Sequence, residues 1–454
     1  MNEQNHCPAL IIPRAEHSIS RSNIDPSALK VLYRLKEAGY DAYLVGGGVR
    51  DMLLGREPKD FDIATNALPE EVKAQFRNCR LVGRRFRLAH VTFGREVIEV
   101  ATFRALSGGG EDEDEDRVVK EDGRILRDNV YGTLEEDAWR RDFTVNALYY
   151  SIRDFSVVDY TGGLADLKEG VLRLIGDPAQ RYREDPVRML RAVRFAVKLG
   201  FRMHPDTERP LAELAPLLEH IPAARLFEEV LKLFLGGCAV QTFEALRHYG
   251  LFGHLFPLTE EVLSQESQGF PRTFVIQALA NTDARIQENK PVTPAFLFAA
   301  LLWEPMRRRA EALAGEPDAG NLEAQQEAAH QVVQEQTRRV VFPKRFSIPM
   351  KEIWLMQPRL MRTTGRAPLR LLSHPRFRAA YDFLMLRAQA GEQLAEACAF
   401  WTRLQAAEDG DREALLAPTS ARPADKKKRR RRGRRKKSTD VSSPSVDAGT
   451  TDPS

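Results

Sequence analysis

The 454-residue chain contains few cysteines and no long hydrophobic run. Its four cysteines, Cys7, Cys79, Cys238 and Cys398, are far apart and form no CxxC or Cys/His cluster. This spacing argues against a structural zinc site and indicates a reducing compartment. No apolar segment approaches the roughly 18 residues of a membrane span, and the N-terminus lacks a secretory signal. We therefore expect a cytoplasmic protein.

Positive charge is concentrated near the C-terminus. The formal net charge is +4, yet residues 426–437 hold eleven Lys or Arg and no acid, so the remainder carries 4 − 11 = −7. Such a block is typical of a disordered arm that binds phosphates, although a solubility tail is the plainer alternative. The candidate RNA-binding residues are Lys426, Lys427, Lys428, Arg429, Arg430, Arg431, Arg432, Arg434, Arg435, Lys436 and Lys437.

The first part of the chain alternates short strands and helices, a pattern typical of an α/β or α+β domain. Asp25 and Pro26 begin a helix that ends at Gly39. Further helices are expected at Val49–Leu54 and Glu70–Arg77. Strands are expected at Ala42–Val45, around Phe61–Ala64, and at Ala89–Phe93 and Val97–Phe103.

Strand patterns disappear after about residue 170, and the rest of the chain predicts helices. Residues 108–116 read GGGEDEDED, which cannot pack and predicts an exposed insertion. The length favours two to four domains. We expect an extension at 1–24, a mixed domain at 25–180, helical domains at 181–270 and 271–415, and a disordered tail at 416–454.

A glycine-rich turn joins a strand to a helix at residues 46–48. Glycines such as Gly46 and Gly47 let backbone N–H groups approach a phosphate closely. The helix that follows adds a positive N-terminus, and Arg50 in its first turn can fork onto phosphate oxygens. Tight turns also favour glycine, so this turn alone is weak evidence for a nucleotide site.

Asp60 and Asp62 make the evidence stronger. At i and i+2 on a strand, both carboxylates project from one face and can bracket a pair of metal ions. A lone DxD is usually a solvated strand end. Here it follows the glycine turn by about a dozen residues, which predicts a nucleotide site at neighbouring strand ends.

Residues 46–65, GGGVRDMLLGREPKDFDIAT, resemble the signature of the polymerase-beta nucleotidyltransferase superfamily. They are similar to the branch that holds bacterial poly(A) polymerases and the CCA-adding enzymes. Three later segments resemble this branch in the same order: RRDFTVNAL at 140–148, GGLADLKEGVLRLIGDP at 162–178 and REDPVRMLRAVRFAVKLGF at 183–201. The resemblance covers about residues 40–205 and is specific, because four motifs occur together.

The resemblance implies an α+β fold, with a polymerase-beta-like catalytic domain built on a mixed β-sheet at 25–180. An all-helical neck at 181–270, a helical body at 271–415 and the disordered basic tail follow. It implies two Mg²⁺ ions held by Asp60 and Asp62, with ATP as substrate.

Further roles follow from the later motifs. Arg141, Asp142 and Asn146 match the ribose-contacting motif, where Arg141 and Asp142 are expected to open a helix. Asp142 would contact ribose or assist the metals. Glu99, an acid within the strand VIEVATF, is the alternative third carboxylate, or else it faces solvent.

Asp185, Arg188 and Arg191 lie at i, i+3 and i+6, and we expect them on one helix face. In the family, a pair such as Asp185 and Arg188 reads the incoming base. A carboxylate accepts from an exocyclic amine and Arg donates to a ring nitrogen, which suits ATP or CTP but not UTP or GTP. A surface salt bridge is the alternative interpretation.

Three features favour poly(A) addition over CCA addition. Residues 78–94, crowded with Arg84, Arg85 and Arg87, are similar to the poly(A) branch, and the basic tail suits unstructured RNA. The chain also contains no His-Asp dipeptide, which is expected in the metal-phosphohydrolase domain fused to some bacterial CCA-adding enzymes. We therefore predict a polynucleotide adenylyltransferase acting on RNA 3′ ends, as a monomer with RNA-decay proteins as candidate partners. A CCA-adding enzyme and a non-catalytic RNA-binding protein are the alternatives.

Overall fold

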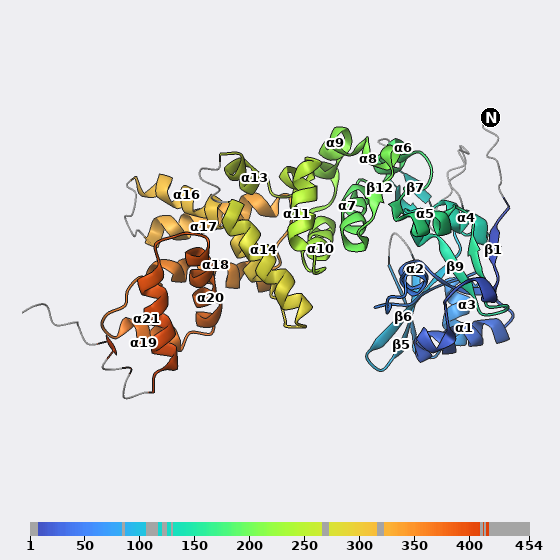
Figure 1. The fold of residues 1–454 in the computed structure, drawn as a ribbon, viewed down its shortest axis with the longest axis horizontal. Helices are drawn as coiled ribbons and strands as arrows, with labels where there is room; N and C mark the ends of the chain where they lie inside the picture. The colour runs from blue at the N-terminus through green and yellow to red at the C-terminus, as the bar shows by residue number, and fades with distance from the viewer. Residues whose placement is uncertain are drawn as a thin grey trace, which may run out of the picture.

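The computed structural model describes residues 8–408 except 84–86, 106–116, 120–124, 129, 266–271 and 316–321, together with 412, 415 and 416. Arg84, Arg85, the acidic residues 111–116 and the basic tail at 426–437 lie outside the described residues. The described part is elongated, with a β-sheet at one end and a curved array of helices leading away from it (Figure 1).

An eight-stranded sheet forms the core of the head, residues 8–184. β3 and β6 run parallel, whereas every other pair of neighbours is antiparallel, which confirms the expected mixed sheet. In spatial order the strands are β1 (Leu10–Ile12), β10 (Val157–Asp159), β9 (Leu148–Ser151), β2 (Ala42–Val45), β3 (Asp62–Thr65), β6 (Glu96–Thr102), β5 (Leu88–Phe93) and β4 (Cys79–Val82).

Half of this sheet was not apparent in the sequence. β9 is buried along its whole length between β10 and β2, so its residues show no alternation of apolar and polar side chains. β1 comes from the N-terminal extension and pairs with β10, with Leu10 opposite Asp159. Part of the extension therefore belongs to the head.

Helices cover the sheet where the sequence predicts them. Asp25 caps α1 (Pro26–Glu37) by accepting from the Ser27 backbone N–H at 2.7 Å, and α1 buries Ala28, Val31, Leu32 and Leu35. After α1, the head helices are α2 (Gly47–Leu53), α3 (Pro69–Gln75), α4 (Leu134–Trp139), α5 (Gly163–Glu169) and α6 (Pro178–Glu184). Short 3₁₀ helices are η1 (Arg14–Glu16), η2 (Arg21–Asn23) and η3 (Thr144–Asn146), and β7 (Arg117–Val119) pairs with β8 (Ile125–Asp128).

The rest of the described chain is helical apart from one short strand. β12 (Arg202–Met203) pairs in parallel with β11 (Val171–Leu172), so the expectation of no strand beyond about residue 170 was wrong. Two-residue strands leave no periodic pattern to read.

The neck contains α7 (Val187–Leu199), α8 (Pro205–Glu208), α9 (Leu211–Leu214), η4 (Ala215–His220), α10 (Ala223–Phe234), α11 (Ala239–His248), α12 (Leu251–Leu255) and α13 (Pro257–Ser264). The body contains α14 (Arg272–Gln287), α15 (Pro294–Leu301), α16 (Trp303–Ala314), α17 (Leu322–Thr337), α18 (Lys344–Leu360), α19 (Ala367–Leu372), α20 (Phe377–Gln389) and α21 (Ala395–Ala406).

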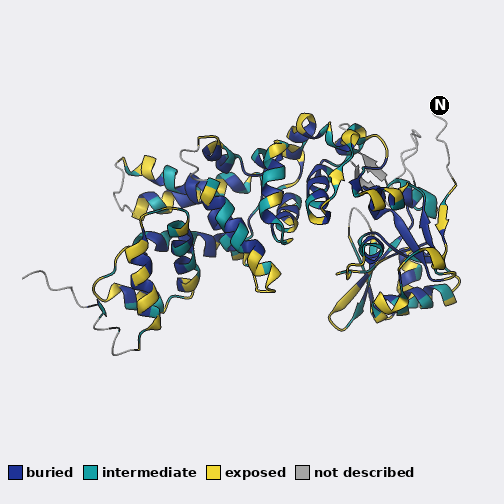
Figure 2. Cartoon of the chain, in the orientation of Figure 1, coloured by how far each residue is buried: buried dark blue, intermediate teal, exposed yellow. Residues whose placement is uncertain are grey.

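One continuous hydrophobic core runs from the head through the neck into the body, and a second packs the end of α18 against α19, α20 and α21. In Figure 2 the buried residues, in dark blue, continue from the head along the helices of the array. This continuity fixes the helical array to the head. Within the ranges given above, no helix is both long and apolar enough to span a membrane.

Candidate active site

The glycine turn lies at the end of β2. Gly46 has φ +76°, a conformation that favours glycine, and α2 starts at Gly47, two residues earlier than the sequence predicted. A Cβ on Gly46 would lie 3.7 Å from Arg141 Nη1, and one on Gly48 would lie 3.2 Å from the Asp60 carbonyl oxygen. The small residues therefore bring the start of α2 against both the DxD segment and Arg141.

Three carboxylates meet beside this turn. Asp60 lies two residues before β3 instead of within it, and Asp62 is the first residue of the strand. Glu99 of β6 pairs in register with Asp62, and it also lies 3.5 Å from His90 Nε2. Although Asp62 can be reached by solvent, burial and the carboxylates of Glu99 and Asp60 raise its pKa to about 6, against the opposing effect of Arg141. The site thus holds crowded negative charge.

This crowding suits a divalent cation. Among the described residues, no group of three or more His, Cys, Asp or Glu side chains is arranged to hold a metal alone. Mg²⁺ is commonly held by one or two carboxylates together with water and substrate phosphates. A cation at Asp60 and Asp62 would relieve the repulsion that raises the pKa of Asp62. The residues therefore fit Mg²⁺ bound jointly with a nucleotide.

Asp142 lies deeper, and both of its oxygens are bonded. Its Oδ2 accepts from Arg191 Nε at 2.7 Å, and its Oδ1 accepts from the Phe143 backbone N–H at 2.8 Å and from Asn146 Nδ2 at 3.3 Å. Burial raises the pKa of Asp142, but Arg191 and the other donors outweigh it and lower the pKa to about 2. Arg141 and Asp142 follow α4 and precede η3, so the expectation that they open a helix was wrong.

Arg50 is almost fully buried, at 2% exposure. It donates from Nε and Nη2 to Asp51 at 2.8 and 2.7 Å, and from Nη1 to Asn146 Oδ1 at 2.6 Å. Arg50 thus links α2 to η3, so a direct fork onto phosphate would require it to exchange these partners.

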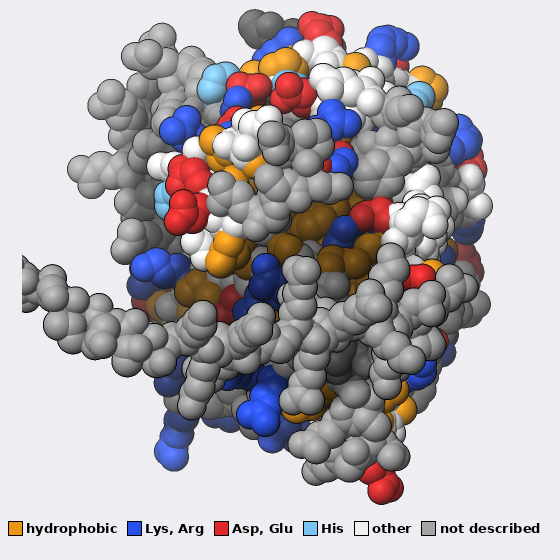
Figure 3. Space-filling model, turned by 90° about the vertical axis from the view of Figure 1, so that its left-hand side faces the viewer, with side chains coloured by type: hydrophobic (Ala, Val, Ile, Leu, Met, Phe, Trp, Pro, Cys, Tyr) orange, Lys and Arg blue, Asp and Glu red, His pale blue; other side chains and the backbone are white. Residues whose placement is uncertain are grey.

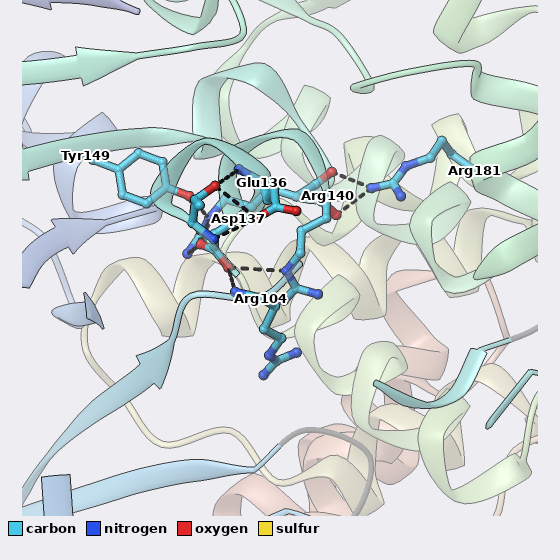
Figure 4. Close-up of polar contacts among 8 residues, drawn as sticks. Arg104, Glu136, Asp137, Arg140, Tyr149 and Arg181 are labelled. Carbon is cyan, nitrogen blue, oxygen red and sulfur yellow. Dashed lines mark hydrogen bonds and ion pairs between the residues drawn. The ribbon is translucent and has the colours of Figure 1, made fainter. Parts of the chain in front are cut away.

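Sequence reasoning missed the residue that holds Arg141. Buried Asp137 accepts from Arg141 Nη2 at 3.0 Å, Arg140 Nε at 3.2 Å and the Tyr149 hydroxyl at 2.8 Å (Figure 4). Burial raises the pKa of Asp137, but Arg141 and Arg140 outweigh it and hold the pKa below its ordinary value. The i,i+3 and i,i+4 spacing to two arginines was the available signal.

The base-reading candidates bridge head and neck. Asp185 caps the end of α6 and lies outside α7, so the expected single helix for Asp185 and Arg188 was wrong. Pro186 causes the break, because the residue before a proline avoids helical angles. Asp185 Oδ2 accepts from Arg225 Nη2 of α10 at 2.6 Å. Arg188 Nη1 donates to the Arg181 carbonyl at 2.8 Å and to Glu184 Oε2 at 3.0 Å.

Arg194 was also missed. It follows Arg191 by three residues on α7, and its guanidinium lies 4.4 Å from the Phe195 ring centroid. Burial and the charge of Arg191 lower the pKa of Arg194 to about 10. Its buried Nε has no hydrogen-bond partner. A buried cation with an unsatisfied donor suits an anionic substrate group.

Sequence comparison places these motifs in known families. The family described as "Poly A polymerase head domain" matches residues 42–173. "Probable RNA and SrmB-binding site of polymerase A" matches 200–263, and "Polymerase A arginine-rich C-terminus" matches 318–437. The chain is 50% identical to poly(A) polymerase I of Salmonella typhi over 419 residues, which is 92% of this chain and 90% of the relative.

CCA-adding enzymes are more distant. That of Geobacillus stearothermophilus is 41% identical over 229 residues, 50% of this chain and 54% of the relative. Among solved structures, the Bacillus stearothermophilus CCA-adding enzyme in complex with CTP is similar over 88% of this chain and 90% of that one. The TM-score is 0.55 and the identity 27%. The likeness to CCA-adding enzymes in sequence is thus confined to about half of the chain.

Proposed function

This chain belongs to the poly(A) polymerase family, and from this we infer that it is a polynucleotide adenylyltransferase. It transfers AMP from ATP to RNA 3′ ends and releases pyrophosphate. The observation that carries this conclusion is the 50% identity over 92% of the chain, because the sequence match to the CCA-adding enzyme of Geobacillus stearothermophilus covers only 50% of it. The DxD pair and the glycine turn argue against a non-catalytic RNA-binding protein.

Incubating the protein with a generic RNA and each nucleoside triphosphate separately tests this function. Long A-tracts from ATP alone are expected. In a further reaction that contains both CTP and ATP, additions that stop after CCA would identify the alternative, a CCA-adding enzyme.

We propose that Asp60 and Asp62 hold two Mg²⁺ ions, which, when bound, lower the pKa of the attacking 3′-hydroxyl and neutralise the triphosphate. Glu99 is the better third carboxylate, because it pairs in register with Asp62 while Asp142 is bound to Arg191. Asp142 is then a positioning residue.

The remaining side chains would orient the nucleotide. Gly46 and Gly47 leave room for its phosphates beside Arg141, which Asp137 and Tyr149 hold in place. The free Nε of Arg194 would donate to a phosphate or ribose oxygen. Asp185 would accept from the adenine amine while Arg188 donates to a ring nitrogen, with Arg225 fixing the position of Asp185.

We further propose a monomer that acts in the cytoplasm, where its tails promote RNA decay and RNA-decay proteins are its partners. The matches to bacterial poly(A) polymerases and to the binding-site family at 200–263 support this proposal.

Replacing Arg188 with Ala should weaken the preference for ATP over UTP and GTP. Loss of one charge-assisted hydrogen bond costs about 1.5–3 kcal/mol, or roughly one to two decades in kcat/KM for ATP. The measurement is kcat/KM for all four nucleotides. Arg183→Ala, an exposed arginine of α6, is the matched control. An unchanged ATP preference in Arg188→Ala would assign base reading to other residues.

Truncation after Pro423 should weaken RNA binding without changing the chemistry. Each single-strand phosphate neutralised adds about 0.7 to the slope of log K against log salt, so if half of the eleven charges engage RNA at once, their removal lowers the slope by roughly three to four units. The measurement is a salt titration of RNA affinity. Truncation after Lys437, which keeps the basic residues, is the control. Parallel slopes for both truncations would favour a solubility tail, and a collapse of kcat at saturating RNA would place the tail in the active site.

A further inference from the structure

A cavity of about 590 Å³ opens in the body between α14, α15, α18 and α20. Figure 1 shows these helices well away from the sheet that carries the catalytic carboxylates. The cavity is therefore separate from the nucleotide site. Its volume lies within the ordinary range for small-ligand pockets, roughly 300–1,000 Å³.

The lining combines an aromatic ring with amides. Phe296 is only partly buried and lines the cavity, held edge-on against Phe383 with ring centroids 5.7 Å apart and an interplanar angle of 71°. Asn281 Oδ1 accepts from Gln277 Nε2 at 3.0 Å, which leaves its Nδ2 as a donor toward a ligand. Gln389 adds a second, exposed amide. An aromatic ring with carboxamides suits a planar base that has both donors and acceptors.

The rim is positively charged. Its acids are already neutralised, since Asp382 pairs with Arg378 at 3.0 Å and Glu288 with Lys290 at 2.5 Å. Arg285 donates from Nε and Nη2 to the Pro291 carbonyl at 3.3 and 2.9 Å, and no ion pair to a carboxylate is found for it within the described residues. Residues 338–381, which contribute α18 and the start of α20, hold eleven Lys or Arg and one acid, Glu352. Lys and Arg side chains also gather at the lower left of this end of the molecule in Figure 3. The surroundings therefore favour a polyanion.

We propose that this cavity binds an adenine base of the RNA strand, some distance upstream of the growing 3′ end. The proposal rests on the proposed function, which supplies a strand of adenines. Phe296 provides a surface for stacking, and carboxamides such as Asn281 bond adenine at N6 and N7. Arg285, which lines the cavity, faces a neighbouring phosphate. The cavity is filled only when the tail is long enough to reach it, so it strengthens binding of RNA that already carries adenines.

The test uses full-length protein and oligo(A) in which 2-aminopurine replaces adenine at successive distances from the 3′ end. Stacking in the cavity should change the fluorescence at one upstream position. Ala284→Trp places a large ring in the cavity from an exposed position of α14, and it should abolish that signal. The same variant should weaken binding of long oligo(A) about five- to a hundred-fold, the range for loss of one stacked base.

Ala312→Trp, at an exposed position of α16 outside the cavity, is the matched control and should behave as wild type. Asn281→Leu keeps the side-chain size and should reduce the preference for oligo(A) over oligo(U). AMP transfer to an oligonucleotide too short to reach the body should be unchanged in all variants. This short-oligonucleotide assay separates the cavity proposal from the proposed function. Absence of AMP transfer by the wild type would refute the proposed function alone. An unchanged fluorescence profile and affinity in folded Ala284→Trp would overturn the cavity proposal, whatever the polymerase activity.

Discussion

Asp60→Asn and Asp62→Asn should each reduce AMP transfer by about 10³-fold or more, because the metal sites supply several kcal/mol of transition-state stabilisation. Neither variant should unfold. At neutral pH the Asp62 carboxylate is repelled by Glu99 and Asp60, so an amide at that position should leave thermal stability equal or slightly higher. The measurements are turnover at saturating Mg²⁺, RNA affinity and a melting curve.

Glu57→Gln is the matched control, since it removes an exposed carboxylate three residues before Asp60 and should keep full activity. Turnover above about a tenth of wild type in either aspartate variant would contradict the assignment of the metal ligands. A large loss of stability would instead give these carboxylates a structural role.

Asp137→Asn should destabilise the head by about 3–5 kcal/mol, because it leaves Arg140 and Arg141 partly buried without their counter-charge. Tyr149→Phe is the graded control. It removes the hydrogen bond that the hydroxyl donates to Asp137 and the one that it accepts from Arg141 Nε, but it keeps both ion pairs, so about 2 kcal/mol is expected. Hydrogen exchange of the head amides measures both variants without requiring two-state unfolding of the whole chain.

The effect of Asp137→Asn should depend on pH in one direction. The pKa of Asp137 is lowered in the folded protein, so its stabilisation is fully present above the unfolded pKa of about 4. It is lost as the pH falls through the lower, folded pKa. Wild type and Asp137→Asn should therefore converge in stability at acidic pH. A difference that persists below that range, or one no larger than that of Tyr149→Phe, would refute the charge argument.

The site was predictable where its chemistry is local in sequence. The glycine turn and the Asp25 cap each depend on residues within about a dozen positions, and both were located, although α2 begins two residues earlier than predicted. The break at Asp185 was also readable, because Pro186 stands beside it, but the i,i+3 spacing of the charges favoured a single helix.

The partners of these residues could not be read from the sequence. Arg225 reaches Asp185 from 40 residues away, and Glu99 meets Asp62 only because β6 pairs with β3. Contacts of this kind depend on tertiary packing, which no local pattern records. β9 was missed for the related reason that a strand buried on both faces shows no alternation.

The order of strands in the sheet also has a consequence for synthesis on the ribosome. β2 to β6 can pair once residue 102 has emerged, but the other edge of β2 waits for β9, and β1 waits for β10, which ends at Asp159. β9 ends at Ser151, 151 − 102 = 49 residues later, so at about 5–20 residues per second the edge of β2 waits roughly two to ten seconds. During this time β2 has an unpaired edge that could pair with another nascent chain. The segment that emerges in the interval includes six consecutive acids at 111–116. Such residues form strands poorly and repel each other, so this part of the segment is a poor false partner for that edge, and β7 and β8, which follow it, pair with each other.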